Sequence, residues 1–138
     1  MRITAQVQNS LNNHQVNLRT GNSVQSLQIP PKSSGLGSSA SGGELLFLAL
    51  ATCYCNDIYR EVAKRKIEVS SVEVEVSGDF NAEGAPAQNV SYRAKVTAQA
   101  GDAEIQELMQ HTDHLAEIQN TLRVETPVTL NQIETVSL

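Results

Sequence analysis

The sequence predicts a single domain of the α+β class, with antiparallel sheets and a long buried central helix. Segments of two-residue periodicity and segments of helical periodicity come in separate blocks, in the order βββ-α-ββ-αα-β, rather than in regular alternation. Such segregation is typical of α+β folds and argues against a doubly wound parallel sheet. The length of 138 residues, 40% of them hydrophobic, suits one domain that folds around its own core.

The N-terminal part of the chain predicts short antiparallel strands followed by a loop. Apolar residues alternate with polar ones over residues 2–8, 16–18 and 27–29, and Asn- and Gly-rich turns separate these runs. Residues 30–43 are rich in Pro, Gly and Ser, which predicts a loop. No Gly-Lys-Ser or Gly-Lys-Thr ending follows its glycines, so we do not expect a nucleotide phosphate site there.

A long helix is predicted to begin directly after this loop. Ser41 and Glu44 have the spacing of a capping box, in which each side chain accepts a backbone N–H of the first turn. Residues 45–53 read LLFLALATC and are apolar around nearly the whole circumference, which predicts a buried helix. Polar residues return from Asn56 onward, so we expect the last turns to emerge into water and the helix to end near Lys66.

Three further strands are predicted in the second half. Alternating valines indicate two long strands with one buried face, at residues 71–77 and 90–98. A third apolar alternation predicts a closing strand at residues 126–133.

Two helices are predicted between the second long strand and the closing strand. Asp102 is expected to cap the first of them, and Thr112 or Asp113 the second. Their apolar positions recur at helical spacing, so each helix should bury one face.

Charge excludes several classes of partner. The formal net charge is −5 and the pI is about 5.1, which disfavours nonspecific binding to nucleic acid or to anionic membranes. The densest basic run, Arg60, Lys64, Arg65 and Lys66, is interpreted as cations that offset the negative end of a helix dipole. The sequence contains neither a membrane-length apolar run nor a signal-peptide core, so we expect a soluble cytoplasmic protein.

Only two cysteines occur, Cys53 and Cys55, and the residue between them places them on different sides of a helix. We therefore expect no disulfide between them. Two cysteines are too few for a disulfide framework or a structural zinc site. His111 and His114 have the spacing of a metal-binding pair but lack a third ligand at recognisable spacing. No metal and no cofactor are predicted.

Two segments resemble the OsmC/Ohr-like superfamily (osmotically inducible protein C and organic hydroperoxide resistance proteins). The stretch SGGELLFLALATCYCNDIYREVAKRKIEVSSVEVEVSGDF is similar to the family's Leu/Ala-rich buried helix, which holds a reactive cysteine and precedes a V-x-V-x-V strand. The segment HLAEIQNTLR resembles the second family signature. The resemblance implies an intertwined α+β homodimer, with active sites near the subunit interface. It also implies organic hydroperoxide reduction, in which a thiolate becomes a sulfenic acid.

The resemblance assigns roles to some residues and leaves others without a match. Cys53 matches the attacking cysteine, whereas the position of the resolving cysteine is Ala116, so the family's disulfide cannot form. One acidic position of the family falls on Gly43, with Glu44 one residue later. The family's N-terminal arginine is missing, and Arg19 is the nearest substitute.

Several neighbours of Cys53 remain candidates for the pocket. His111, His114 and Glu117 could line it, although a solvated histidine beside a helix cap is the commoner case. The matched spacing predicts that Ala116 lies close to Cys53.

Two functions stay open at this point. One is a peroxidase with a single attacking cysteine, whose ligand is a hydroperoxide and whose reductant is an external thiol. The alternative is a noncatalytic relative that binds a small hydrophobic ligand at the dimer interface. A cysteine in an apolar helix also serves as a plain core residue.

Overall fold

The computed structural model describes all 138 residues and has the predicted α+β composition, with two antiparallel sheets and three helices. The elements, in chain order, are β1 (Ile3–Ser10), β2 (Asn13–Thr20), β3 (Ser23–Ser26), α1 (Gly42–Arg65), β4 (Val69–Asp79), β5 (Gln88–Ala98), α2 (Asp102–Leu115) and α3 (Glu117–Arg123). The chain divides into two compact units, Met1–Leu46 and Phe47–Leu138. No helix is long and apolar enough to cross a lipid bilayer.

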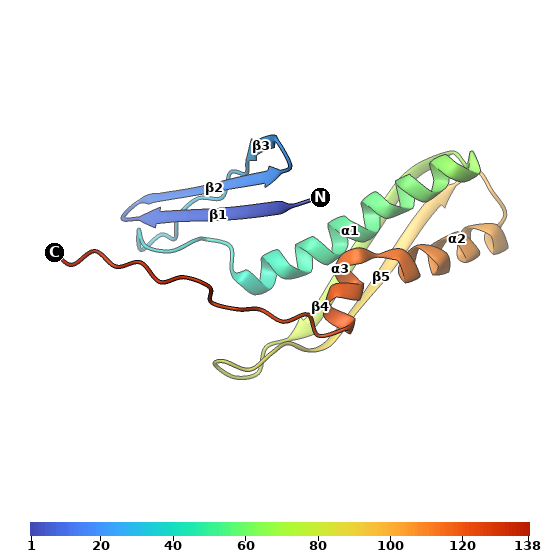
Figure 1. Cartoon of the computed structure of the whole chain (residues 1–138). Helices are drawn as coiled ribbons and strands as arrows, with labels where there is room; N and C mark the ends of the chain where they lie inside the picture. Colours follow the sequence, from blue (N-terminus) through green and yellow to red (C-terminus); the bar gives the residue numbers. More distant parts are fainter. The chain divides into compact units, whose positions relative to one another are not determined.

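The N-terminal unit contains a three-stranded antiparallel sheet in the order β1-β2-β3 (Figure 1). The strand predicted at residues 27–29 is absent, and the third strand instead occupies Ser23–Ser26. Thr20 pairs directly with Ser23 around the two-residue turn Gly21-Asn22, and Gly21 adopts the positive φ of 57° that such a turn requires. The strand therefore starts immediately after the turn. Every side chain of β1 is exposed, so its apolar residues have no cover within this unit.

The predicted capping box opens α1. The Ser41 N–H donates to Glu44 Oε1 at 2.8 Å, and the Glu44 N–H donates to Ser41 Oγ at 3.1 Å. The helix then runs for 24 residues, so both of its predicted ends are confirmed to within a residue.

The burial along α1 runs opposite to the prediction. None of residues 45–49 is fully buried, and Leu48 is 56% exposed, whereas Asp57, Ile58 and Glu61 near the polar end are buried. The reason is the tertiary packing of this helix. The second half of α1 packs within the Phe47–Leu138 unit, where other elements supply apolar contacts, and Arg60 and Lys64 of α1 itself pair with its buried acidic side chains.

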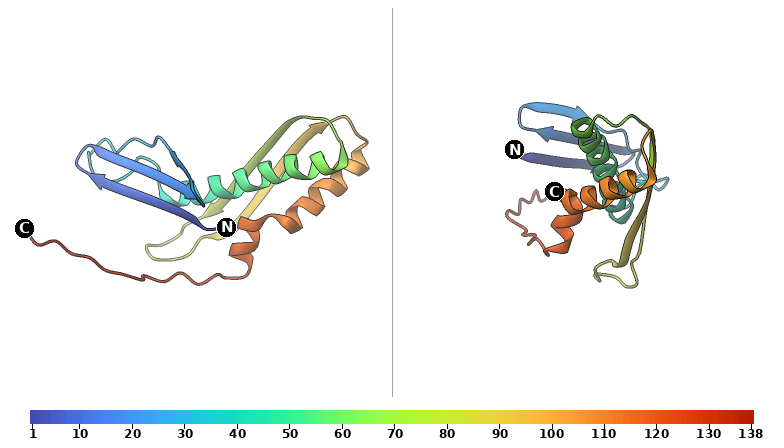
Figure 2. Two further views of the ribbon diagram at one scale, coloured as in Figure 1. Left: turned by 45° about the horizontal axis from the view of Figure 1, so that its top comes forward. Right: turned by 90° about the vertical axis from the view of Figure 1, so that its right-hand side faces the viewer.

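The core of the C-terminal unit lies between helices α1 and α2 and one face of the β4-β5 sheet (Figure 2). Tyr54, Ile58 and Val62 from α1 meet Leu108 from α2 in its centre. Alternate side chains of the two strands complete it, as the valine pattern predicted: Val69, Val72, Val74, Tyr92, Ala94 and Val96. This packing fixes the face of α1 that carries the polar cluster described below.

The two predicted C-terminal helices exist, but their boundaries differ from the prediction. Gly101, and not Asp102, is the N-cap residue of α2, and no side chain caps that end. Neither Thr112 nor Asp113 starts the next helix, because α2 continues to Leu115. Ala116, in extended conformation, separates α2 from α3.

The predicted closing strand at residues 126–133 is absent. This segment forms no strand, and Val128, Leu130 and Ile133 are 98%, 81% and 75% exposed. A strand needs a neighbour to satisfy its backbone groups. The β4-β5 sheet of this unit has only two strands, neither of which pairs with the C-terminal segment.

Candidate functional site

Cys53 lies half-buried on α1, between two carboxylates. Its Sγ is 3.6 Å from Asp57 Oδ2, one turn further along the same helix, and 3.6 Å from Glu117 Oε2, at the start of α3. The backbone N–H of Ile118 also donates a hydrogen bond to the thiol. The i, i+4 spacing puts Cys53 and Asp57 on one face of α1, and α3 supplies the second carboxylate and the N–H.

Ala116, which the sequence resemblance assigns to the resolving position, is fully buried at the junction of α2 and α3. The next two residues, Glu117 and Ile118, both contact Cys53. The structure therefore brings the Ala116 segment to Cys53 and provides no second thiol there. Cys53 and Cys55 are both free.

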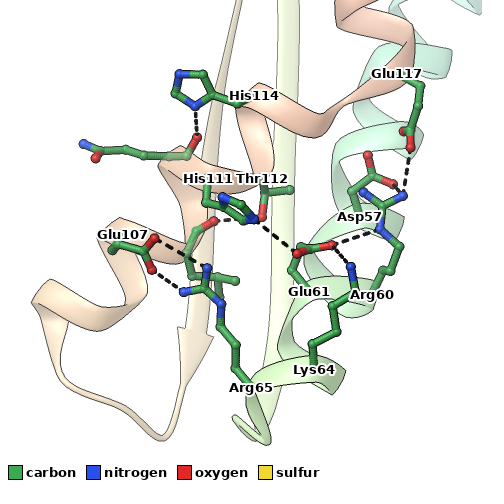
Figure 3. A network of polar contacts seen from close by, with 12 residues as sticks. Asp57, Arg60, Glu61, Lys64, Arg65, Glu107, His111, Thr112, His114 and Glu117 are labelled. Atoms are coloured by element: carbon green, nitrogen blue, oxygen red, sulfur yellow. Dashed lines mark hydrogen bonds and ion pairs between the residues drawn. The ribbon is translucent and has the colours of Figure 1, made fainter.

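Arg60 joins three carboxylates (Figure 3), two of which are the neighbours of Cys53. Its guanidinium contacts Glu117 Oε1 at 2.9 Å, Glu61 Oε2 at 3.0 Å and Asp57 Oδ1 at 3.2 Å. The interpretation of Arg60 as a cation that offsets a helix dipole is therefore wrong. Only Lys64 and Arg65 lie in the last turn of α1.

The network extends away from Cys53 through the buried Glu61. Its carboxylate accepts from Lys64 Nζ at 3.0 Å and lies 3.4 Å from His111 Nε2 on α2. His111 thus contacts Glu61 rather than the thiol. His114 has a different partner, since its Nδ1 lies 2.8 Å from the backbone oxygen of Gln110.

The surroundings of Cys53 favour a neutral thiol. Burial raises the pKa of Cys53, the Ile118 N–H opposes this, and the negative charges of Asp57 and Glu117 raise the pKa further. The two carboxyls differ from each other. Burial and the neighbouring Glu117 raise the pKa of Asp57. The backbone N–H of Glu117 and the Arg60 guanidinium lower the pKa of Glu117 to about 2.

The remaining predicted residues lie elsewhere. Glu44 serves as the cap of α1, and its bonds to Ser41 lower its pKa. Arg19 lies on β2 in the N-terminal unit and lines a hollow on the sheet together with Asn17 and Val24. Cys55 lines a separate hollow beside Val74 of β4.

Sequence reasoning found Cys53 and Glu117 but did not assign Asp57, Arg60 and Glu61 to the site. A signal was present, because Cys53, Asp57, Arg60 and Glu61 recur at spacings of three and four residues, which place them on one side of a helix. Because an apolar run precedes Asn56, the polar residues after it are interpreted, from the sequence alone, as the solvent-exposed end of the helix.

Cys53, Asp57 and Glu117 are also residue types that ligate metals, and their ligand atoms lie within 4.8 Å of one another. Arg60 already occupies the position between the two carboxyl groups, and a cation would have to displace it. We therefore interpret the cluster as a hydrogen-bonded network.

Comparisons with solved structures support the fold. An OsmC-like protein from Mycoplasma pneumoniae is 19% identical, with a TM-score of 0.58 over 88% of this chain and 86% of that chain. An OsmC-like protein of unknown function from Vibrio cholerae is 14% identical, with a TM-score of 0.60 over 88% and 93%. An organic hydroperoxide resistance protein, OsmC, from Legionella pneumophila is 20% identical, with a TM-score of 0.55 over 89% and 90%.

A search of the curated proteins finds no significant match. The family model described as OsmC-like protein matches residues 35–131, which include α1, the β4-β5 sheet, α2 and α3. Cys53 and the polar cluster around it lie within the matched region. From this match we conclude that the chain belongs to the OsmC-like protein family.

Proposed function

We propose that this protein reduces organic hydroperoxides through the single thiol of Cys53, with an external thiol as reductant. The observation that carries the proposal is the position of the Cys53 thiol. It lies 3.6 Å from the carboxylate of Glu117, which Arg60 holds in place at 2.9 Å. An ionised carboxylate in contact with a neutral thiol can accept its proton as the sulfur attacks.

The reaction has two stages. The sulfur of Cys53 attacks the terminal oxygen of the hydroperoxide, the O–O bond breaks, and the products are an alcohol and a sulfenic acid at Cys53. An external thiol then displaces water from the sulfenic acid and forms a mixed disulfide with Cys53. A second external thiol releases the reduced enzyme and leaves with the first as a disulfide. Ala116 explains why both reducing equivalents come from outside.

Two further facts support this proposal. Relatives of the same fold include proteins named for organic hydroperoxide resistance, from Legionella pneumophila and Elizabethkingia anophelis. The sequence resemblance also assigns Cys53 to the attacking cysteine of the family. A role in the response to oxidative stress, in the cytoplasm and as a homodimer, follows as part of the proposal.

Turnover with cumene hydroperoxide and hydrogen peroxide tests the proposal, with dithiothreitol and a dihydrolipoyl compound as alternative reductants. We expect wild type and Cys55→Ser to turn over the organic peroxide, and Cys53→Ser to be inactive. Activity in Cys53→Ser, or none in folded wild type, would contradict the proposal.

One observation favours the alternative, a noncatalytic protein that binds a small hydrophobic ligand at the dimer interface. Burial and two carboxylates raise the pKa of Cys53, and no resolving thiol is present. If this alternative holds, Cys53 resists peroxide, and an apolar fluorescent probe binds wild type and Cys53→Ser with equal affinity.

A further inference from the structure

The two carboxylates that flank Cys53 are equally near the thiol but differ in their surroundings. Asp57 Oδ2 and Glu117 Oε2 are each 3.6 Å from Sγ. The Asp57 side chain is 9% exposed, whereas that of Glu117 is 61% exposed. Arg60 contacts both, with the shorter distance to Glu117. The arrangement thus offers the sulfur two carboxyl groups of unequal environment.

When two neighbouring carboxyl groups lie in different environments, one of them holds a proton more tightly than the other. Like charges in contact disfavour ionisation of both groups, so the buried group keeps the proton to higher pH and the solvated group loses it first. The pKa directions agree, since that of Asp57 is raised and that of Glu117 is lowered to about 2.

The other charged groups nearby do not alter this division. Glu61, also on α1, accepts from Arg60 and Lys64 and contacts His111 of α2. These contacts leave Lys64 and His111 bound to Glu61 rather than to Asp57 or Glu117.

We propose that Glu117 is the base and Asp57 the acid of peroxide reduction at Cys53, with Arg60 as the positioning residue that holds both. This inference rests on the proposed function and deepens it. The thiol proton passes to the Glu117 carboxylate as sulfur bonds to the terminal peroxide oxygen. As the O–O bond breaks, the Asp57 carboxyl gives its proton to the departing alkoxide, which leaves as alcohol. The proton on Glu117 then passes to Asp57 and restores the pair.

The leaving group of the peroxide tests the role of Asp57. Cumene hydroperoxide releases an alkoxide that needs a proton, whereas a peracid releases a carboxylate that does not. At pH 6 we expect Asp57→Asn to slow Cys53 oxidation by cumene hydroperoxide about 100-fold, a typical contribution of general acid catalysis. Because a carboxylate leaving group needs no proton, we expect Asp57→Asn to change the rate of oxidation by peroxybenzoic acid less than about threefold. Equal slowing with both oxidants would overturn the assignment of the acid.

Glu107→Gln is the matched control for this experiment. Glu107 is an exposed carboxylate that pairs with Arg65 of α1 and does not contact Cys53. We expect both oxidation rates to match those of wild type. If the oxidation rate of this variant fell only with cumene hydroperoxide, the assignment of Asp57 as the acid would be overturned, because the effect would not be specific to a carboxyl group beside Cys53.

Glu117→Gln tests the base, and its exposed side chain makes it the safer variant for folding. Removal of a negative charge lowers the pKa of the thiol and by itself speeds oxidation, so a slower rate identifies lost proton transfer. We expect about a 100-fold loss at pH 6, which disappears as the pH rises above the pKa of Cys53. Arg60→Lys should show a smaller loss with the same pH dependence.

The outcomes separate the two proposals. If hydroperoxides and peracids leave Cys53 of wild type unmodified, the proposed function fails. If wild type is oxidised and Glu117→Gln keeps the wild-type rate and pH profile, only the assignment of the base fails.

Discussion

The residues around Cys53 disfavour ionisation of its thiol and also lie where they would assist proton transfer during attack on a peroxide. Desolvation and the two neighbouring carboxyl groups disfavour the thiolate, which would protect a single cysteine without a resolving partner from indiscriminate oxidation. The same carboxylates lie where proton transfer during attack would occur. Reactivity then depends on a substrate that engages this cluster, rather than on a permanently ionised sulfur.

The raised pKa of Cys53 predicts how its alkylation depends on pH. Because the folded protein disfavours the thiolate, the alkylation rate with iodoacetamide should reach half its maximum above the ordinary cysteine pKa of about 8.5. Asp57→Asn should move this midpoint to lower pH, since it removes a charge that raises the pKa. A Cys55→Ser background isolates the relevant thiol. A midpoint at or below the ordinary value would contradict the described environment.

Restoring a thiol at position 116 should restore a disulfide. Ala116→Cys is expected to form a bond with Cys53 after peroxide treatment, detected as a mass loss of two hydrogens, if the Cα atoms lie within about 7 Å. The disulfide should protect Cys53 from over-oxidation and raise sustained turnover. Ala116→Ser is the control for the change in a buried position. Failure to form this disulfide in a folded variant would argue against the match between Ala116 and the resolving position.

At the scale of secondary-structure elements, the sequence predicted features that depend on neighbouring residues better than features that depend on contacts with another element. The capping box at Ser41 and the alternating valines of β4 act within a few residues, and both elements are present. The closing strand at residues 126–133 needs a neighbouring strand that its unit does not supply. The burial of Asp57 and Glu61 depends on α2 and α3, whose contacts with this face of α1 no local pattern contains.

Gly78 permits the close approach of α1 to β4. A Cβ atom at this position would lie 2.8 Å from Phe47 Cζ, 3.1 Å from Val90 Cγ2 and 3.3 Å from the Gln88 backbone oxygen. We expect Gly78→Ala to lower the free energy of unfolding by about 1–3 kcal/mol, as overpacking typically does. Gly42→Ala, where nothing lies within 4 Å, is the control. Urea denaturation that shows equal stability for both variants would contradict this packing.

At the scale of the whole molecule, much apolar surface remains uncovered in a single chain. Large hydrophobic side chains are exposed on β1, on the first half of α1 and along the C-terminal segment: Ile3, Val7, Leu48, Val128, Leu130, Ile133 and Val136. Exposed apolar surface of this extent is typical of interaction surfaces. The predicted homodimer would cover this apolar surface. A single domain over residues 1–138 remains a prediction from the sequence.

Sedimentation tests the homodimer. We expect a dimer at micromolar concentration, with an interface above about 2,000 Å² in total, the range of obligate assemblies. Leu130→Glu should weaken it, because a charge would enter the apolar surface. A stable folded monomer of wild type at that concentration would contradict the expectation.

The intact mass of the protein after graded exposure to cumene hydroperoxide shows whether Cys53 attacks peroxides. If Cys53 attacks peroxides without a resolving partner, wild type should gain one oxygen as a sulfenic acid and then a second as a sulfinic acid at excess peroxide. Cys53→Ser should gain neither, and Cys55→Ser should behave as wild type. A Cys53 that stays unmodified at peroxide levels that oxidise other exposed low-pKa thiols would contradict the proposed reaction.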